Sequence, residues 1–144
     1  MRRVGRKRGR AIRLALLFPL LIPAVVGAQA NPKAILGTWR GTSTCVDKVT
    51  FPACNDEEVI YQVTAIDNSD SVTVHAEKIV KGKREAMGDN IFGPESGGTW
   101  VSRFPMGRYT GVITLTLRGD EIEGDFVQQM RGRVRKISLQ REKS

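Results

Sequence analysis

The chain has 144 residues, a formal net charge of +8 and an isoelectric point near 10. Seven of its 23 basic residues lie within the first thirteen positions, which leaves 16 basic and 15 acidic side chains in residues 31–144. Residues 31–144 therefore have a net charge of about +1. They lack the strongly basic surface that binds nucleic acid, so nucleic acid is excluded as a partner.

The first 30 residues have the three parts of a secretory signal peptide. Seven basic residues lie within positions 2–13, the apolar run "LALLFPLLIPAVVG" follows, and Ala28-Gln29-Ala30 is a small-x-small cleavage site. The apolar run is short for a bilayer span, and two prolines interrupt it. We predict a signal peptide over 1–30 and a secreted or periplasmic domain over 31–144 with no stable membrane insertion after cleavage. An uncleaved N-terminal anchor is the alternative.

Residues 31–144 alternate with a period of two almost throughout, and no helix is predicted there. The turn-forming sequences "DNSD", "KGK", "GPESGG", "FPMGR" and "RGDE" separate about eight strands. The expected strands are 35–44, 58–67, 71–80, 83–92, 98–104, 109–118, 121–129 and 133–141. Short turns between consecutive strands predict one all-β domain, a single antiparallel up-and-down β-barrel, because closure removes exposed sheet edges. A two-sheet sandwich is the alternative.

Alternation assigns one face of each strand to the interior. On strand 58–67, the residues expected to face inward are Val59, Tyr61, Val63 and Ala65. On the last strand, Val134 and Ile137 differ in parity, which predicts a β-bulge near Arg135 and Lys136.

Cys45 and Cys54 are the only cysteines, and both lie in the predicted exported part. An even number of cysteines in an exported chain predicts a structural disulfide, since the destination is oxidising. A pair of metal ligands is the weaker interpretation, because the chain has one histidine and no second cysteine pair. No metal site is therefore predicted.

The sequence contains no recognisable catalytic constellation. His75 alternates with Thr73 and Glu77 on a predicted outer face, and no sequence neighbour supplies a nucleophile. There is no G-x-S-x-G elbow and no glycine-rich phosphate loop before a helix. The basic cluster in 131–136 is expected to pair across strands with the acidic residues of 121–125. We predict neither an enzyme nor a bound cofactor.

Aromatic side chains fall largely on the inward faces. The candidate ligand-binding residues are Trp39, Tyr61, Trp100 and Phe126. The interior of an eight-stranded barrel is either filled by its side chains or just wide enough for one small ligand. The sequence leaves both possibilities open.

Gly37-Thr38-Trp39 resembles the G-x-W signature on the first strand of lipocalins and related calycin-type barrels. In those families the Trp closes one end of the barrel and packs against a basic residue of the last strand, which implies Arg135 or Arg141 here. Avidin-like barrels begin with a similar tripeptide, so the resemblance is to a group of barrels. The chain also looks similar to small exported bacterial proteins of uncharacterised function.

The resemblance implies a lipocalin-like barrel that binds a small apolar molecule. We therefore expect an exported protein with a small hydrophobic or aromatic ligand in its lumen. The alternative is a non-catalytic envelope or protein-interaction module with a packed barrel as scaffold. Its contact surface would be the loop at 45–58 or the "GPESGGTW" loop.

Overall fold

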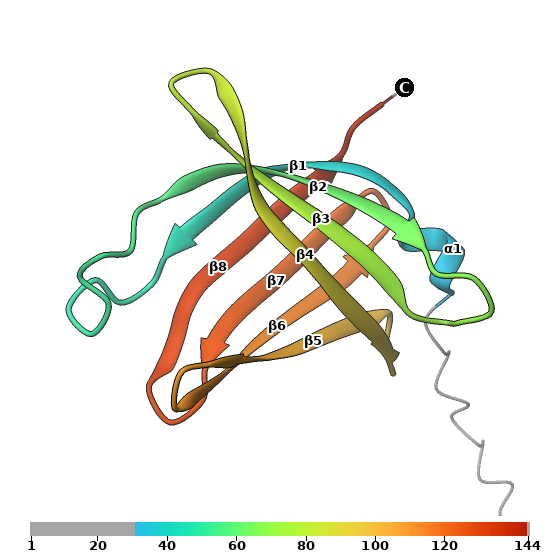
Figure 1. Ribbon diagram of the computed structural model, residues 1–144. Helices are drawn as coiled ribbons and strands as arrows, with labels where there is room; N and C mark the ends of the chain where they lie inside the picture. The colour runs from blue at the N-terminus through green and yellow to red at the C-terminus, as the bar shows by residue number, and fades with distance from the viewer. Residues whose placement is uncertain (1–30, 144) are drawn as a thin grey trace, which may run out of the picture.

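A computed structural model describes residues 31–143 (Figure 1). The predicted signal peptide at 1–30 lies outside the described residues. The strands are β1 (Gly37–Cys45), β2 (Glu57–Ala65), β3 (Val72–Val80), β4 (Lys83–Glu95), β5 (Thr99–Met106), β6 (Tyr109–Arg118), β7 (Glu121–Gln128) and β8 (Gly132–Arg141). They form one closed barrel in sequence order, and every neighbouring pair is antiparallel. The predicted up-and-down barrel is confirmed, and the sandwich is excluded.

Glycines lie in two of the turns at which the sequence predicted that strands end. Gly82 and Gly119 have φ angles of +76° and +63° in the β3–β4 and β6–β7 turns. Glycine adopts such angles without the steric penalty that a Cβ brings. Strand β6 matches the predicted 109–118, whereas β4 continues to Glu95, beyond the predicted end at residue 92.

One helical turn precedes the barrel, so the prediction of no helix is wrong at this point. Helix α1 covers Pro32–Ile35, and the Asn31 side chain accepts a hydrogen bond of 3.0 Å from the Lys33 amide. Proline suits the first turn of a helix because its φ is already fixed there. Four residues are too few to produce a helical periodicity in the sequence. The first strand consequently begins at Gly37 rather than at residue 35.

The half of the barrel under α1 is filled by large side chains. Ile35 of α1 is fully buried, and Figure 1 shows the helix at the opposite end from the β1–β2 loop. The buried residues of this half include Trp39, Val63, Val72, Phe92, Trp100, Leu115 and Ile122. Ala65, expected to face inward, is exposed at the end of β2, because the strand reaches the barrel rim there. No helix within residues 31–143 is long and apolar enough to cross a membrane.

The predicted bulge in the last strand is confirmed one residue before its expected position. Phe126 pairs with Arg135 and Val127 pairs with Arg133, so Val134 is the extra residue of β8. An extra residue reverses the alternation of the strand beyond it. The bulge therefore explains why Val134 and Ile137 are both buried although they differ in parity.

A second bulge, in β4, was not predicted. Ala76 pairs with Gly88 and Glu77 pairs with Ala86, which leaves Met87 as the extra residue. Gly88 has a φ of +121°, a conformation that glycine adopts far more readily than other residues.

Strands β4 and β5 pair only near the α1 end of the barrel. Residues Gly93–Glu95 pair with Thr99–Val101, and the remaining lengths of the two strands pair only with β3 and β6. Figure 1 shows the β3–β4 hairpin projecting away from the β5–β6 hairpin. The barrel ring is therefore closed by a short junction at this place.

The loop between β1 and β2 lies at the end of the barrel opposite α1. Cys45 and Cys54 form the predicted disulfide across this loop. The Arg131 guanidinium lies 4.6 Å from the Phe51 ring centroid and donates a 2.9 Å hydrogen bond to the Thr50 carbonyl. The loop is thus fixed at its base by the disulfide and at its middle by the β7–β8 turn.

Candidate functional site: a cavity in the barrel lumen

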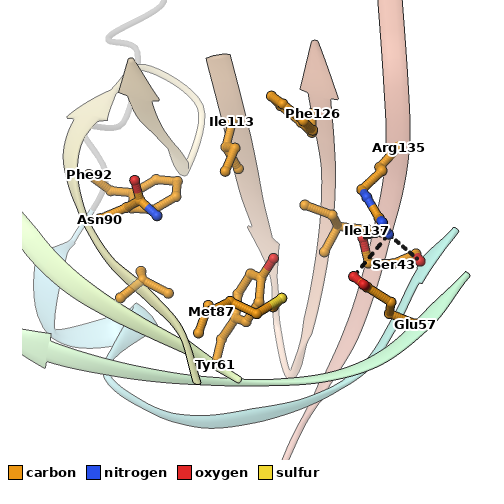
Figure 2. Close-up of a pocket in the computed structure, with 12 residues that line it drawn as sticks. Ser43, Glu57, Tyr61, Met87, Asn90, Phe92, Ile113, Phe126, Arg135 and Ile137 are labelled. Carbon is orange, nitrogen blue, oxygen red and sulfur yellow. Dashed lines mark hydrogen bonds and ion pairs between the residues drawn. The ribbon is translucent and has the colours of Figure 1, made fainter. Parts of the chain in front are cut away.

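A cavity of about 150 Å3 occupies the lumen away from α1, and we call it the lumenal cavity (Figure 2). The residues that line it are Ser43, Glu57, Tyr61, Val74, Ala76, Met87, Asn90, Phe92, Ile113, Phe126, Arg135 and Ile137. Most of these side chains are apolar. The lumen is therefore filled at one end and hollow toward the other.

Small residues on two adjacent strands, β3 and β4, leave this space open. Ala76 of β3 pairs with Tyr61 of β2 on one side and with Gly88 of β4 on the other. Neither the methyl group of Ala76 nor Gly88 extends into the lumen as a larger side chain would. Across the cavity, Ile113 of β6 and Phe126 of β7 form a paired apolar wall (Figure 2).

One side of the cavity holds a charged pair. Arg135 Nη1 lies 3.2 Å from Glu57 Oε2 and donates to the carbonyl and hydroxyl oxygens of Ser43 at 3.1 and 3.2 Å. The side chains of Arg135 and Glu57 are 17% and 21% exposed. Lys78 approaches the other Glu57 oxygen at 3.7 Å from the rim. The charges at this wall are thus already partnered within the protein.

The Tyr61 side chain enters the cavity from β2 and points its hydroxyl toward the centre (Figure 2). Tyr61 is only 6% exposed. Burial raises the pKa of this phenol to about 12; the nearby Arg135 acts in the lowering direction and Glu57 in the raising one. The phenol therefore stays protonated over the whole physiological range.

The raised pKa of Tyr61 predicts an alkaline loss of stability. Below pH 10 the phenol is neutral in both states, whereas between pH 10 and about 12 only the unfolded chain releases the proton. The free energy of unfolding should therefore fall across this window. At pH 12 this one group should account for about 2 kcal/mol of the loss. Urea unfolding of wild type and Tyr61→Phe at pH 8, 10 and 12 measures it. Parallel losses in the two proteins would contradict the assignment.

Two of the four predicted ligand-binding aromatics line the lumenal cavity. Tyr61 and Phe126 are in its wall, whereas Trp39 and Trp100 are buried in the filled half and are not among its lining residues. Trp100 Nε1 is a buried donor without a hydrogen-bond partner among the described residues. Of the four predicted residues, only Tyr61 and Phe126 therefore lie together at the lumenal cavity.

Trp39 lies at the end of the barrel that α1 covers. Its Nε1 donates a 2.8 Å hydrogen bond to the Ile35 carbonyl, and the Arg141 guanidinium carbon lies 4.1 Å from the centroid of its ring. Arg141 is therefore the basic residue that packs against this Trp. Arg135, the other residue considered for this role, faces the lumenal cavity instead.

Sequence reasoning missed the polar members of the site. Glu57 shares the parity of Val59 and Tyr61, and Arg135 shares the parity of Ile137, so alternation alone places both on inward faces. Two inward charges of opposite sign on different strands are the signal that could have found the pair. Asn90 was missed because no inward face was assigned to strand 83–92, although Asn90 shares the parity of Phe92 and both lie beyond the bulge at Met87.

The outer face holds the other polar groups that the sequence singled out. His75 Nδ1 lies 2.5 Å from Asp89 Oδ1 on the exposed side of β3 and β4. The expected cross-strand pairing is confirmed for two members of the basic cluster: Arg133 with Asp125 at 2.9 Å and Lys136 with Glu123 at 3.4 Å. Within the described part of the chain, no group of three or more His, Cys, Asp or Glu side chains is arranged to hold a metal ion.

No family model matches the chain, and no curated protein sequence matches it. Among solved structures, the chain is similar to an S-type phycobiliprotein lyase from Guillardia theta, with 17% identity and a TM-score of 0.44. The match covers 78% of this chain and 91% of that one. The barrel assignment follows from the strand pairing of this chain and does not depend on this distant likeness.

Proposed function

We propose that this protein is a non-catalytic, lipocalin-like binding protein that holds one small hydrophobic or aromatic molecule in its lumenal cavity. The observation that carries the proposal is the cavity of about 150 Å3, whose walls are mostly apolar and whose charged side chains are paired with each other. An apolar cavity of similar volume accommodates benzene, so this one suits a molecule built around a single ring. A ligand there would contact Tyr61 and Phe126, two of the residues expected from the sequence.

The charged groups of the cavity support binding rather than catalysis. Of the twelve residues that line it, Glu57 is the one with a carboxylate, and that carboxylate is engaged by Arg135. General acid–base chemistry needs a group that is free to exchange a proton with the substrate.

Contacts of a ligand with Trp39 or Trp100, the other two residues expected to bind it, would require the ligand to reach the filled half of the lumen.

Export is part of the proposal. The signal peptide at 1–30 would direct residues 31–144 to a secreted or periplasmic location, where an oxidising environment maintains disulfides. The Cys45–Cys54 bond is compatible with that location. A protein-interaction module with a packed scaffold, the other function considered, would have no need for a hollow lumen, so the cavity favours the binding protein.

Filling the cavity from β3 tests the proposal. Ala76→Phe places a ring opposite Tyr61, whereas Ala86→Phe makes the same substitution at an exposed site on β4. We expect p-xylene to shift NMR signals of wild type and Ala86→Phe with equal affinity, and Ala76→Phe to bind at least about tenfold more weakly, since occupied volume excludes the probe.

Ala76→Leu introduces a smaller side chain and should lower the affinity for p-xylene by an intermediate amount, so it replaces Ala76→Phe if the larger substitution disturbs folding. Circular dichroism checks that each variant is folded. Failure of both p-xylene and its hydroxyl analogue p-cresol to bind wild type, or equal p-xylene binding by wild type and the Ala76 variants, would contradict the proposed function. Solvent extraction of protein purified from its own cells, followed by mass spectrometry, would identify the natural ligand.

A further inference from the structure

The polar groups of the lumenal cavity fall into two sets that differ in their availability. Arg135, Glu57 and Ser43 bond to one another, as the dashed lines in Figure 2 show. The Tyr61 hydroxyl and the Asn90 side-chain amide point toward the open space. Among the hydrogen bonds of residues 31–143, none involves either of these two groups. They are therefore the polar atoms that a bound molecule would meet.

The closed charge network determines which ligand charge the cavity tolerates. The Arg135 guanidinium is committed to Glu57 and to two oxygens of Ser43, so it offers little to an anionic ligand. The Glu57 carboxylate lies between Arg135 and Lys78, so it offers little to a cationic one. An ion that leaves water for a site without a free counter-charge loses far more hydration energy than it regains.

The Tyr61 hydroxyl and the Asn90 amide, which have no hydrogen-bond partner within residues 31–143, require that an uncharged ligand carry a polar group. A buried hydroxyl without a partner costs free energy, and a purely apolar ligand would bury the Tyr61 hydroxyl without one. The raised pKa of Tyr61 keeps this group a hydrogen-bond donor as well as an acceptor. Asn90, two positions before Phe92 on β4, supplies an amide donor and a carbonyl acceptor. A neutral polar substituent on the ligand satisfies these groups.

Building on the proposed function, we infer that the ligand is a neutral single-ring molecule with a hydroxyl or carbonyl group that hydrogen-bonds Tyr61 and Asn90. Its ring contacts Ile113 and Phe126, while its polar group lies against the β2–β4 wall. The Arg135–Glu57 pair holds that wall in shape without contributing a charge to recognition.

Four probes separate the parts of this inference. p-Xylene and p-cresol are nearly isosteric and differ by one methyl-to-hydroxyl exchange, while benzoate and benzylammonium carry a negative and a positive charge. NMR titrations of the purified protein with each probe at pH 7 give the affinities. Tyr61→Phe removes only the phenolic oxygen, and Tyr109→Phe makes the same change outside the cavity, where Tyr109 contacts Arg131.

We expect Tyr61→Phe to weaken p-cresol relative to p-xylene by about five- to tenfold, the effect of one net hydrogen bond. Asn90→Leu should act in the same direction, and Tyr109→Phe should change neither affinity. Benzoate and benzylammonium should bind more weakly than p-cresol to every variant.

Equal weakening of p-cresol and p-xylene by Tyr61→Phe would overturn the hydrogen bond to Tyr61. Tighter binding of either ion than of p-cresol would overturn the neutral ligand. Failure of both p-xylene and p-cresol to bind wild type would instead contradict the proposed function, so the two hypotheses fail by different results.

Discussion

Replacing Trp39 by alanine is expected to cost about 3–5 kcal/mol of unfolding free energy, the usual range for a buried aromatic residue. Trp39 is fully buried, and its Nε1 donates to the Ile35 carbonyl of α1 at 2.8 Å. The Arg141 guanidinium lies on its ring and donates to the carbonyls of Leu36 and Ala34 at 2.8 and 2.7 Å. Removing the ring therefore leaves a cavity and weakens the attachment of α1 to the end of β8.

Urea denaturation of Trp39→Ala, Trp39→Phe and Thr38→Ala measures this effect. Trp39→Phe keeps most of the packing and loses the hydrogen bond, so a smaller loss is expected. Thr38→Ala, a change on the outward-facing neighbour, should stay within about 0.5–1 kcal/mol of wild type. A loss below about 1 kcal/mol for Trp39→Ala would show that the covered end of the barrel does not depend on this residue.

Breaking the charged pair of the lumenal cavity is expected to have the second-largest effect. Among the described residues, Arg135→Leu leaves the Glu57 carboxylate with only the more exposed Lys78, at 3.7 Å, and Glu57→Leu leaves the Arg135 guanidinium with only the two Ser43 oxygens. Loss of one partner of a buried pair typically costs 3–5 kcal/mol, and partial exposure here reduces the expected loss to about 2–3 kcal/mol. The double variant Glu57→Leu, Arg135→Leu should recover most of it, because no charge then remains uncompensated.

Arg133 and Asp125 supply a matched control for this cycle. They belong to the same two strands as Phe126 and Arg135 but face outward, with side chains 50% and 35% exposed. Arg133→Leu should cost less than about 1 kcal/mol, the usual value for a surface ion pair. Urea denaturation of the single and double variants gives the coupling energies. Additive losses at Glu57 and Arg135 would show that the two side chains are energetically independent.

The number and order of the strands could be predicted because turn-forming residues separate the alternating segments, although some strand ends differ by two or three residues from the expected ones. Alternation indicated the inward faces of Tyr61 and Phe126, and Gly82 and Gly119 marked the β3–β4 and β6–β7 hairpins. The partner of Trp39 could not be chosen, because Arg135 and Arg141 have the same parity on the last strand. Only the stagger between β1 and β8, in which Trp39 pairs with Arg141, distinguishes them.

The cavity was beyond prediction for a different reason. The number of bulky inward residues is compatible with a filled lumen, but their distribution along the barrel axis depends on strand register. Trp39, Trp100 and Phe92 gather toward the α1 end, while Ala76 and Gly88 coincide at the level of Tyr61. Ala76 and Gly88 are paired only because Met87 is an extra residue in β4. Methionine is not a residue type that indicates a β-bulge, so the sequence did not predict it.

The short junction between β4 and β5 has a mechanical consequence. Opening the barrel between any other two neighbouring strands breaks a long ladder of backbone hydrogen bonds, whereas opening it here breaks only those of Gly93–Glu95 with Thr99–Val101. Local openings follow the route that breaks the fewest bonds. We therefore expect the barrel wall to open first between β4 and β5, alongside the strand that carries Met87 and Asn90.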